Sequence, residues 1–161
     1  MQFHIENEFP WQAYVQSFDN SHSISGSCGG ALISRRHVLT AAHCVVKPYD
    51  EVYNTADMID VTLGTNDVDW AGDGEKFAVS KVFPHPGWDI IGETGPDFAI
   101  LTLSKPVKLS KRINTVCMPS FSNEHFLGKP GKTLSVAGWG RTSNNKSIEK
   151  SQSEGNSERK L

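Results

Sequence analysis

The feature that most constrains the fold is a series of short strand-like runs separated by turn residues. Residues 11–16 alternate, with Trp11, Ala13 and Val15 on one face, as in a strand with one buried side. Similar runs cover residues 29–34, 36–40, 60–64, 75–83, 97–103 and 133–139. Clusters of Gly, Asn, Asp and Pro separate the runs, and no segment keeps a long 3.6-residue period. This pattern predicts an all-β sandwich or barrel.

Length and composition narrow the class of protein further. The 161 residues favour a single domain. Hydrophobic residues make up 37% and charged residues 21%, which is lean but outside the disordered class. The formal net charge is −2 and no block of Lys or Arg stands out, so we predict no nucleic-acid partner and no membrane partner. No apolar run approaches the roughly 18 residues of a membrane span.

Both ends of the chain differ from this β-rich body. Residues 143–161 are mostly Ser, Asn, Glu and Lys, with only Ile148 and Leu161 as large apolar side chains. Such a segment buries too little surface to offset its ordering entropy, so we predict a disordered polar tail. Asn145 opens a glycosylation sequon, a triplet that is frequent by chance. At the start, residues 1–4 have neither the basic nor the apolar region of a signal peptide.

The three cysteines, Cys28, Cys44 and Cys117, leave at least one thiol without a partner within this chain. In a cytosolic protein they would be inert buried thiols. The surroundings of Cys44 favour a different interpretation. His43 precedes it and follows two small residues in the run LTAAHC, and small neighbours let a substrate approach an imidazole closely. A solvated loop His beside a buried Cys would be the simpler explanation if the His stood alone.

His43 does not stand alone, because other motifs accompany it in a fixed order. They are FPWQ with its preceding Glu at residues 8–12, CGGALIS at 28–34, LTAAHC at 39–44, PDFAILTL at 96–103 and VAGWG at 136–140. In this order the motifs resemble the chymotrypsin/trypsin family of serine proteases over about residues 8–142. The resemblance implies an all-β fold of two Greek-key barrels. It places a complete six-stranded first barrel at about residues 8–119 and the start of the second at about 131–142.

The same resemblance implies roles for individual residues. His43 would be the general base and Asp97 the acid that orients its imidazole. Asp89 and Glu93 lie nearby, but only Asp97 directly precedes an apolar strand, which would carry it inward.

The cysteines also take expected pairings from the family. Cys28 and Cys44 would form a disulfide, contributing about 3 kcal/mol on the chain-entropy model. Cys117 matches a family cysteine that often bonds to a propeptide, so here it is expected to be unpaired or to form an interchain disulfide.

The triad Ser is missing from the sequence. In the family it follows the Asp by about 90 residues, which would place it near position ~190. No GDSGG motif occurs in the chain, and residues 4–7 do not resemble the family's mature amino terminus. We therefore expect a chain truncated at both ends, by biology or by a partial gene, and inactive alone.

A metal site is the remaining candidate, in the segment 64–77. It contains Asp67, Asp69, Asp73 and Glu75, and carboxylates of this kind can bind Ca²⁺. The corresponding family loop binds calcium in some members, but Thr65 and Gly72 stand where further carboxylates are expected. A solvated acidic loop is the better interpretation, so we predict no metal and no cofactor.

Three functional hypotheses follow. The first is a secreted serine endopeptidase, acting on protein or peptide substrates, of which this chain is one part. The second is a non-catalytic serine protease homologue that acts as a binding module. The third is that the isolated chain has no stable function, because a lone barrel would expose the apolar face that packs on its partner. A cooperative melt would separate the second hypothesis from the third.

Overall fold

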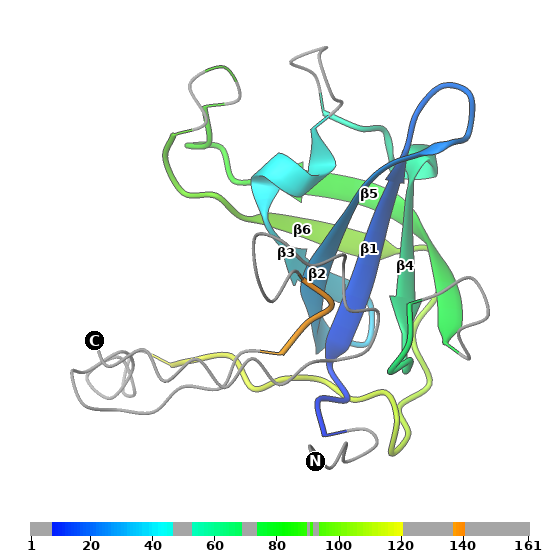
Figure 1. Cartoon of the computed structure of the whole chain (residues 1–161). Coiled ribbons are helices and arrows are strands. Elements are labelled where there is room, and N and C mark those ends of the chain that lie inside the picture. Colours follow the sequence, from blue (N-terminus) through cyan, green and yellow to red (C-terminus); the bar gives the residue numbers. More distant parts are fainter. Residues whose placement is uncertain are drawn as a thin grey trace.

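The computed structural model describes residues 8–46, 53–68, 74–89, 91, 94–120 and 137–140. Within these residues the regular structure is almost entirely strand (Figure 1). The strands are β1 (Gln12–Phe18), β2 (Ile24–Ser34), β3 (His37–Thr40), β4 (Ile59–Leu63), β5 (Glu75–Pro84) and β6 (Ala99–Leu103). Two short 3₁₀ helices, η1 (Ala42–Val45) and η2 (Ala56–Met58), lie between β3 and β4. No helix in the described part of the chain has the length and apolar character needed to cross a membrane.

The six strands close into one antiparallel barrel. Their order around the barrel is β1-β2-β3-β6-β5-β4, and β4 pairs with β1 to complete the circle. Closure leaves no unpaired sheet edge among these strands. The predicted all-β class and the complete six-stranded first barrel are confirmed.

The core follows from the two-residue period of the strands. In β1 the side chains of Ala13 and Val15 are buried and their neighbours are only partly covered. In β6 the pattern is the same, with Ala99, Leu101 and Leu103 fully buried. Because each such side chain contributes about 1.5–3 kcal/mol when removed from water, the filled interior stabilises the barrel.

Glycine is required where β2 approaches β3. A Cβ placed on Gly30 would lie 2.9 Å from the carbonyl oxygen of Leu39, closer than real side chains come. This carbonyl belongs to the backbone and cannot move without disturbing the ladder in which Gly30 faces Thr40. The second Gly of the CGGALIS motif is therefore a packing requirement of the β2–β3 pair.

The predicted strand at residues 133–139 lies mostly outside the described residues. Of the start of the second barrel, the structure describes Ala137–Gly140, and these residues form no strand there. Trp139 is 7% exposed, lies edge-on to Tyr14 of β1 and donates from its indole Nε1 to the carbonyl oxygen of Asn66. The segment is drawn in orange beside the barrel in Figure 1. The predicted disordered tail, 143–161, also lies outside the described residues.

Removing a core side chain of β6 should destabilise the barrel. Leu101→Ala deletes a fully buried side chain and leaves a cavity, so we expect the free energy of unfolding to fall by about 2–5 kcal/mol. Leu109→Ala is the control, because Leu109 is 40% exposed and should change stability far less. Urea unfolding measures both. Equal losses for the two variants would contradict the assignment of the core.

Candidate active site

Two neighbouring strands bring His43 and Asp97 to the same end of the barrel. Strand β3 pairs antiparallel with β6, and Thr40, its last residue, faces Ala99, the first residue of β6. His43 follows Thr40 by three positions and Asp97 precedes Ala99 by two. The pairing of β3 with β6 therefore joins two motifs that are 54 residues apart in the sequence.

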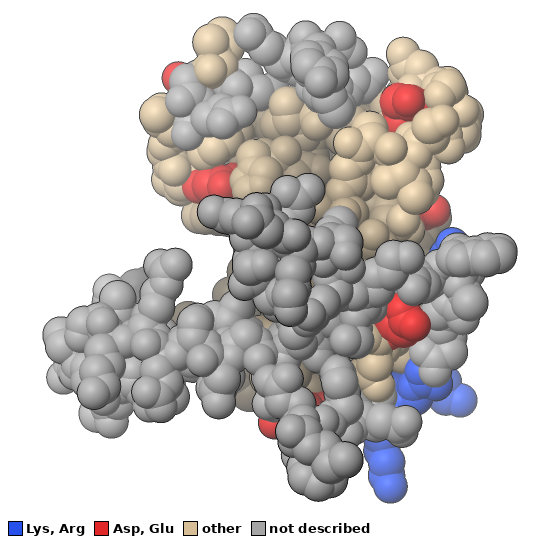
Figure 2. All heavy atoms as spheres, viewed as in Figure 1, with Lys and Arg blue, Asp and Glu red and all other residues tan. Residues whose placement is uncertain are grey.

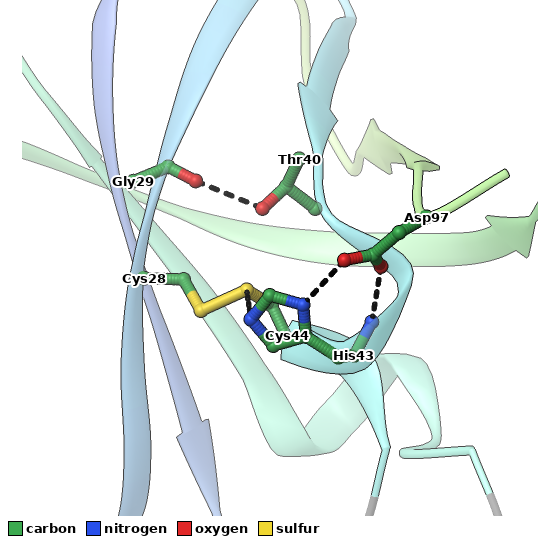
Figure 3. Close-up of polar contacts among 6 residues, drawn as sticks. All are labelled: Cys28, Gly29, Thr40, His43, Cys44 and Asp97. Carbon is green, nitrogen blue, oxygen red and sulfur yellow. Dashed lines mark hydrogen bonds and ion pairs between the residues drawn. A yellow bond between two sulfur atoms is a disulfide. The ribbon is translucent and has the colours of Figure 1, made fainter. Parts of the chain in front are cut away.

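The carboxylate of Asp97 contacts His43 twice (Figure 3). One oxygen, Oδ1, accepts a hydrogen bond from the backbone N–H of His43 at 3.0 Å. The other, Oδ2, lies 2.7 Å from the ring Nδ1. When Nδ1–H donates to the carboxylate, the neutral imidazole has its lone pair on Nε2. The arrangement thus fixes both the orientation of the ring and the atom that can take a proton.

The turn carrying His43 is tied to β2. His43 lies in η1, and its neighbour Cys44 forms a disulfide with Cys28 of β2, with Cα atoms 6.1 Å apart. Nearby, the hydroxyl of Thr40 donates to the carbonyl oxygen of Gly29 at 2.9 Å. The predicted Cys28–Cys44 disulfide is present, and it holds η1 against the barrel wall (Figure 3).

The His43–Asp97 pair is open to solvent on this chain. The side chain of His43 is 57% exposed and that of Asp97 is 37% exposed. The expectation that the following strand carries Asp97 inward is therefore wrong for this structure. Asp97 precedes β6 rather than belonging to it, and inward alternation begins only at Ala99.

Hydrogen bonding keeps Asp97 ionised. Partial burial raises the pKa of Asp97, but the backbone N–H of His43, its ring and its charge lower it by more. The net result is a pKa below the ordinary value of 3.8. Near neutral pH the group next to Nδ1 is therefore a carboxylate, the form that accepts a proton-bearing nitrogen.

The second ring nitrogen of His43 faces the disulfide. Nε2 lies 3.4 Å from Sγ of Cys44. A disulfide sulfur carries no hydrogen and is a weak acceptor. Nε2 therefore retains its ability to accept a proton from another group.

The alternative acids do not occupy this position. Asp89 serves its own loop, where Oδ1 accepts from the backbone N–H of Ile91 and the backbone pairs with Thr94. Glu93 lies outside the described residues. Asp97 is thus the acid found beside His43, and its catalytic role stays a prediction.

One aromatic contact next to Asp97 was not predicted from the sequence. The rings of His85 and Phe98 lie 4.5 Å apart, and the backbone N–H of His85 donates to the carbonyl oxygen of Phe98. Thirteen positions separate the two residues and no strand period connects them. Only the folded loop brings them together.

The described residues offer one cluster with metal-ligand chemistry, formed by Cys28, His43 and Cys44. Their ligand atoms lie within 4.8 Å of one another. Because the two cysteines share a disulfide, they have no thiolates to donate to a metal.

The acidic loop considered for calcium is only partly described. Its Asp67 backbone N–H donates to the hydroxyl of Thr65, whereas Asp69 and Asp73 lie outside the described residues. The expectations of no metal and no cofactor stay predictions.

Cys117 is exposed and forms no disulfide within this chain. This agrees with the odd cysteine count. Its bond to a propeptide cysteine stays a prediction, because no second chain is present.

Comparison with known proteins gives one consistent result. A sequence model of the trypsin family matches residues 4–158. Serine protease 7 of Drosophila melanogaster is 35% identical over 84% of this chain and 37% of its own length. Phenoloxidase-activating factor 3 of Holotrichia diomphalia is 31% identical over 90% of this chain and 43% of its own length. Venom serine protease 34 of Apis mellifera is 34% identical over 86% of this chain and 33% of its own length. The chain thus spans well under half of these relatives.

Removing the disulfide should loosen the turn that holds His43. The double variant Cys28→Ala/Cys44→Ala opens a link across 16 positions, and we expect a loss of about 3 kcal/mol in the free energy of unfolding. Cys117→Ala, which removes an exposed free thiol, is the control and should leave stability nearly unchanged. Chemical unfolding without reductant provides the comparison. A double variant as stable as the control would show that the link does not constrain the fold.

The Asp97 carboxylate should make stability depend on pH in a defined direction. Its pKa is lower in the folded chain than the ordinary 3.8, so its stabilising contribution is present above that value and is lost as pH falls through the folded pKa. Asp97→Asn should therefore lose less stability than the parent between about pH 5 and pH 2. The urea midpoint at each pH measures this. Other carboxylates such as Asp19 also have a lowered pKa, but they act in both proteins and cancel in the difference. Parallel pH profiles would contradict the assignment.

Proposed function

Because this chain belongs to the trypsin family of serine proteases, we propose that it supplies the general base and the orienting acid of a serine endopeptidase. The base is His43 and the orienting acid is Asp97. The single observation that carries the proposal is the 2.7 Å contact between Nδ1 of His43 and Oδ2 of Asp97. It leaves Nε2 as the proton acceptor, the arrangement by which a serine hydroxyl is made nucleophilic.

Each residue performs one step of the proposed reaction. As a serine hydroxyl attacks the carbonyl carbon of a peptide bond, its proton passes to Nε2 of His43. The carboxylate of Asp97 stabilises the resulting imidazolium through the Nδ1–H bond, without taking the proton itself. His43 then returns the proton to the leaving amine, so the base ends the acylation step neutral.

The nucleophile is assigned to sequence beyond these 161 residues. The chain contains no GDSGG motif, and it spans only 33–43% of the three relatives described above. We propose that the 161-residue chain alone is inactive, since a base has no effect without a hydroxyl to activate. For the whole protein the substrate class is a protein or peptide, as the family implies.

An extracellular location fits this function. Disulfides persist in oxidising compartments, and the Cys28–Cys44 bond closes the turn that carries the base. Two relatives are named for extracellular fluids, a venom serine protease and a clotting factor subunit of Tachypleus tridentatus. We therefore propose that the protein acts outside the cell.

A covalent probe tests the assignment. The 161-residue chain should not react with a fluorophosphonate, which labels activated serine nucleophiles, whereas the protein extended through a GDSGG sequence and processed at its amino terminus should. In that longer protein we expect His43→Ala to lower kcat/KM by about 10⁶-fold and Asp97→Asn by about 10⁴-fold. Asp89→Asn is the matched control and should keep activity. Stoichiometric labelling of the short chain, or an active His43→Ala protein, would overturn the proposal.

A further inference from the structure

The described cations of this chain are gathered rather than dispersed. All the described Lys and Arg residues except Lys76 and Lys81 lie in two short segments, Arg35–Arg36 and 105–112. The first segment is the turn between β2 and β3, and the second follows β6. About 70 positions separate them, so neither looks like a basic block in the sequence. We use the name basic surface for Arg35, Arg36, Lys105, Lys108 and Lys111, all of them exposed.

Hydrogen bonds hold the two segments together. The backbone N–H of Val107 donates to the carbonyl oxygen of Arg35 at 2.7 Å, and that of Leu103 donates to the carbonyl oxygen of Arg36 at 2.8 Å. The guanidinium groups reach across in the same way. Arg35 donates from Nε to the carbonyl oxygen of Val107, and Arg36 donates from Nη2 to that of Ser104. The two arginines are therefore positioned by the backbone, and less side-chain entropy remains to be lost when an anion binds.

The charges of the basic surface are not neutralised by the described part of the chain. No Asp or Glu occurs from residue 98 to residue 120, and none of the five cations has an ion pair with a described residue. Lys105 lies over the ring of Phe77, 5.2 Å from its centroid, a contact that leaves its charge in place. In Figure 2 the Lys and Arg spheres lie at the right and lower right of the molecule, while the acidic spheres are scattered.

We propose that the basic surface binds a linear sulfated polysaccharide. Lys105, Lys108 and Lys111 recur every third position in a segment without helix or strand, so they offer charge repeatedly along its length. A protein partner would need apolar or aromatic anchors at the centre of its interface. The segment exposes only Leu109 as a large apolar side chain, at 40%. Repeated cations without such an anchor suit a polymer of regularly spaced sulfates.

The basic surface lies away from the proposed active site. Arg36 directly precedes β3, and His43 follows its other end, so the four residues of β3 separate them. At about 3.3 Å per residue, this strand keeps a bound polymer off His43. The proposed site is therefore an attachment site, independent of the proteolytic function and present on the 161-residue chain.

Heparin binding by the folded 161-residue chain tests the proposal, with chemically desulfated heparin and poly-glutamate as comparison polymers. We expect the parent chain to bind heparin, with an affinity that falls as salt rises. Lys108→Gln and Lys111→Gln should each weaken binding about fivefold and flatten the salt dependence. Asn20→Asp is the matched control, because it makes the same change in net charge in the β1–β2 turn, at the other end of β2 from Arg35. It should leave binding unchanged.

Four outcomes would overturn the proposal. These are no binding of heparin, equal binding of desulfated heparin, an equal loss in Asn20→Asp, and tighter binding of poly-glutamate, which would indicate an acidic protein partner instead. Because each substituted side chain is exposed, circular dichroism of every variant should match the parent. A third variant, Lys105→Gln, provides a further test if either of the other two unfolds.

Discussion

The antiparallel pairing of β3 with β6 is the contact on which the rest of the structure depends. It closes the barrel between β2 and β5, and it places the end of β3 beside the start of β6. The turn with His43 and the residue Asp97 lie just beyond these ends, so the hydrogen-bonded pair follows from the strand register. At the opposite end, the same pairing joins Arg36 to Leu103 and assembles the basic surface. One ladder therefore organises both proposed sites.

The pair illustrates how a barrel prepares a base without burying it. The Cys28–Cys44 disulfide and the bond from the His43 backbone N–H to Asp97 fix the turn. Hydrogen bonding outweighs burial and lowers the pKa of Asp97, so the acid is ionised where the imidazole needs it. Both side chains remain substantially exposed. A wall that covers them would strengthen the ion pair, because removing water lowers the local dielectric constant.

Much of the fold could be predicted from the sequence because two-residue alternation reports burial directly. The strands at residues 11–16 and 75–83 were predicted within a few residues of β1 and β5. The motifs also identified His43 and Asp97, since each lies beside a recognisable strand. Exposure of Asp97 was predicted wrongly, because a strand period does not extend to the residue before the strand. The contact between His85 and Phe98 and the basic surface were missed because each joins residues that only the folded chain brings together.

The central claim is that the first barrel alone sets the His43 imidazole against Asp97. Nitrogen-15 NMR of the imidazole rings in the 161-residue chain tests this most directly, because it identifies which ring nitrogen carries the proton. The account predicts that neutral His43 holds its proton on Nδ1, protected from exchange, and that Asp97→Ala removes this protection. A ring protonated mainly on Nε2, or one unaffected by Asp97→Ala, would contradict it.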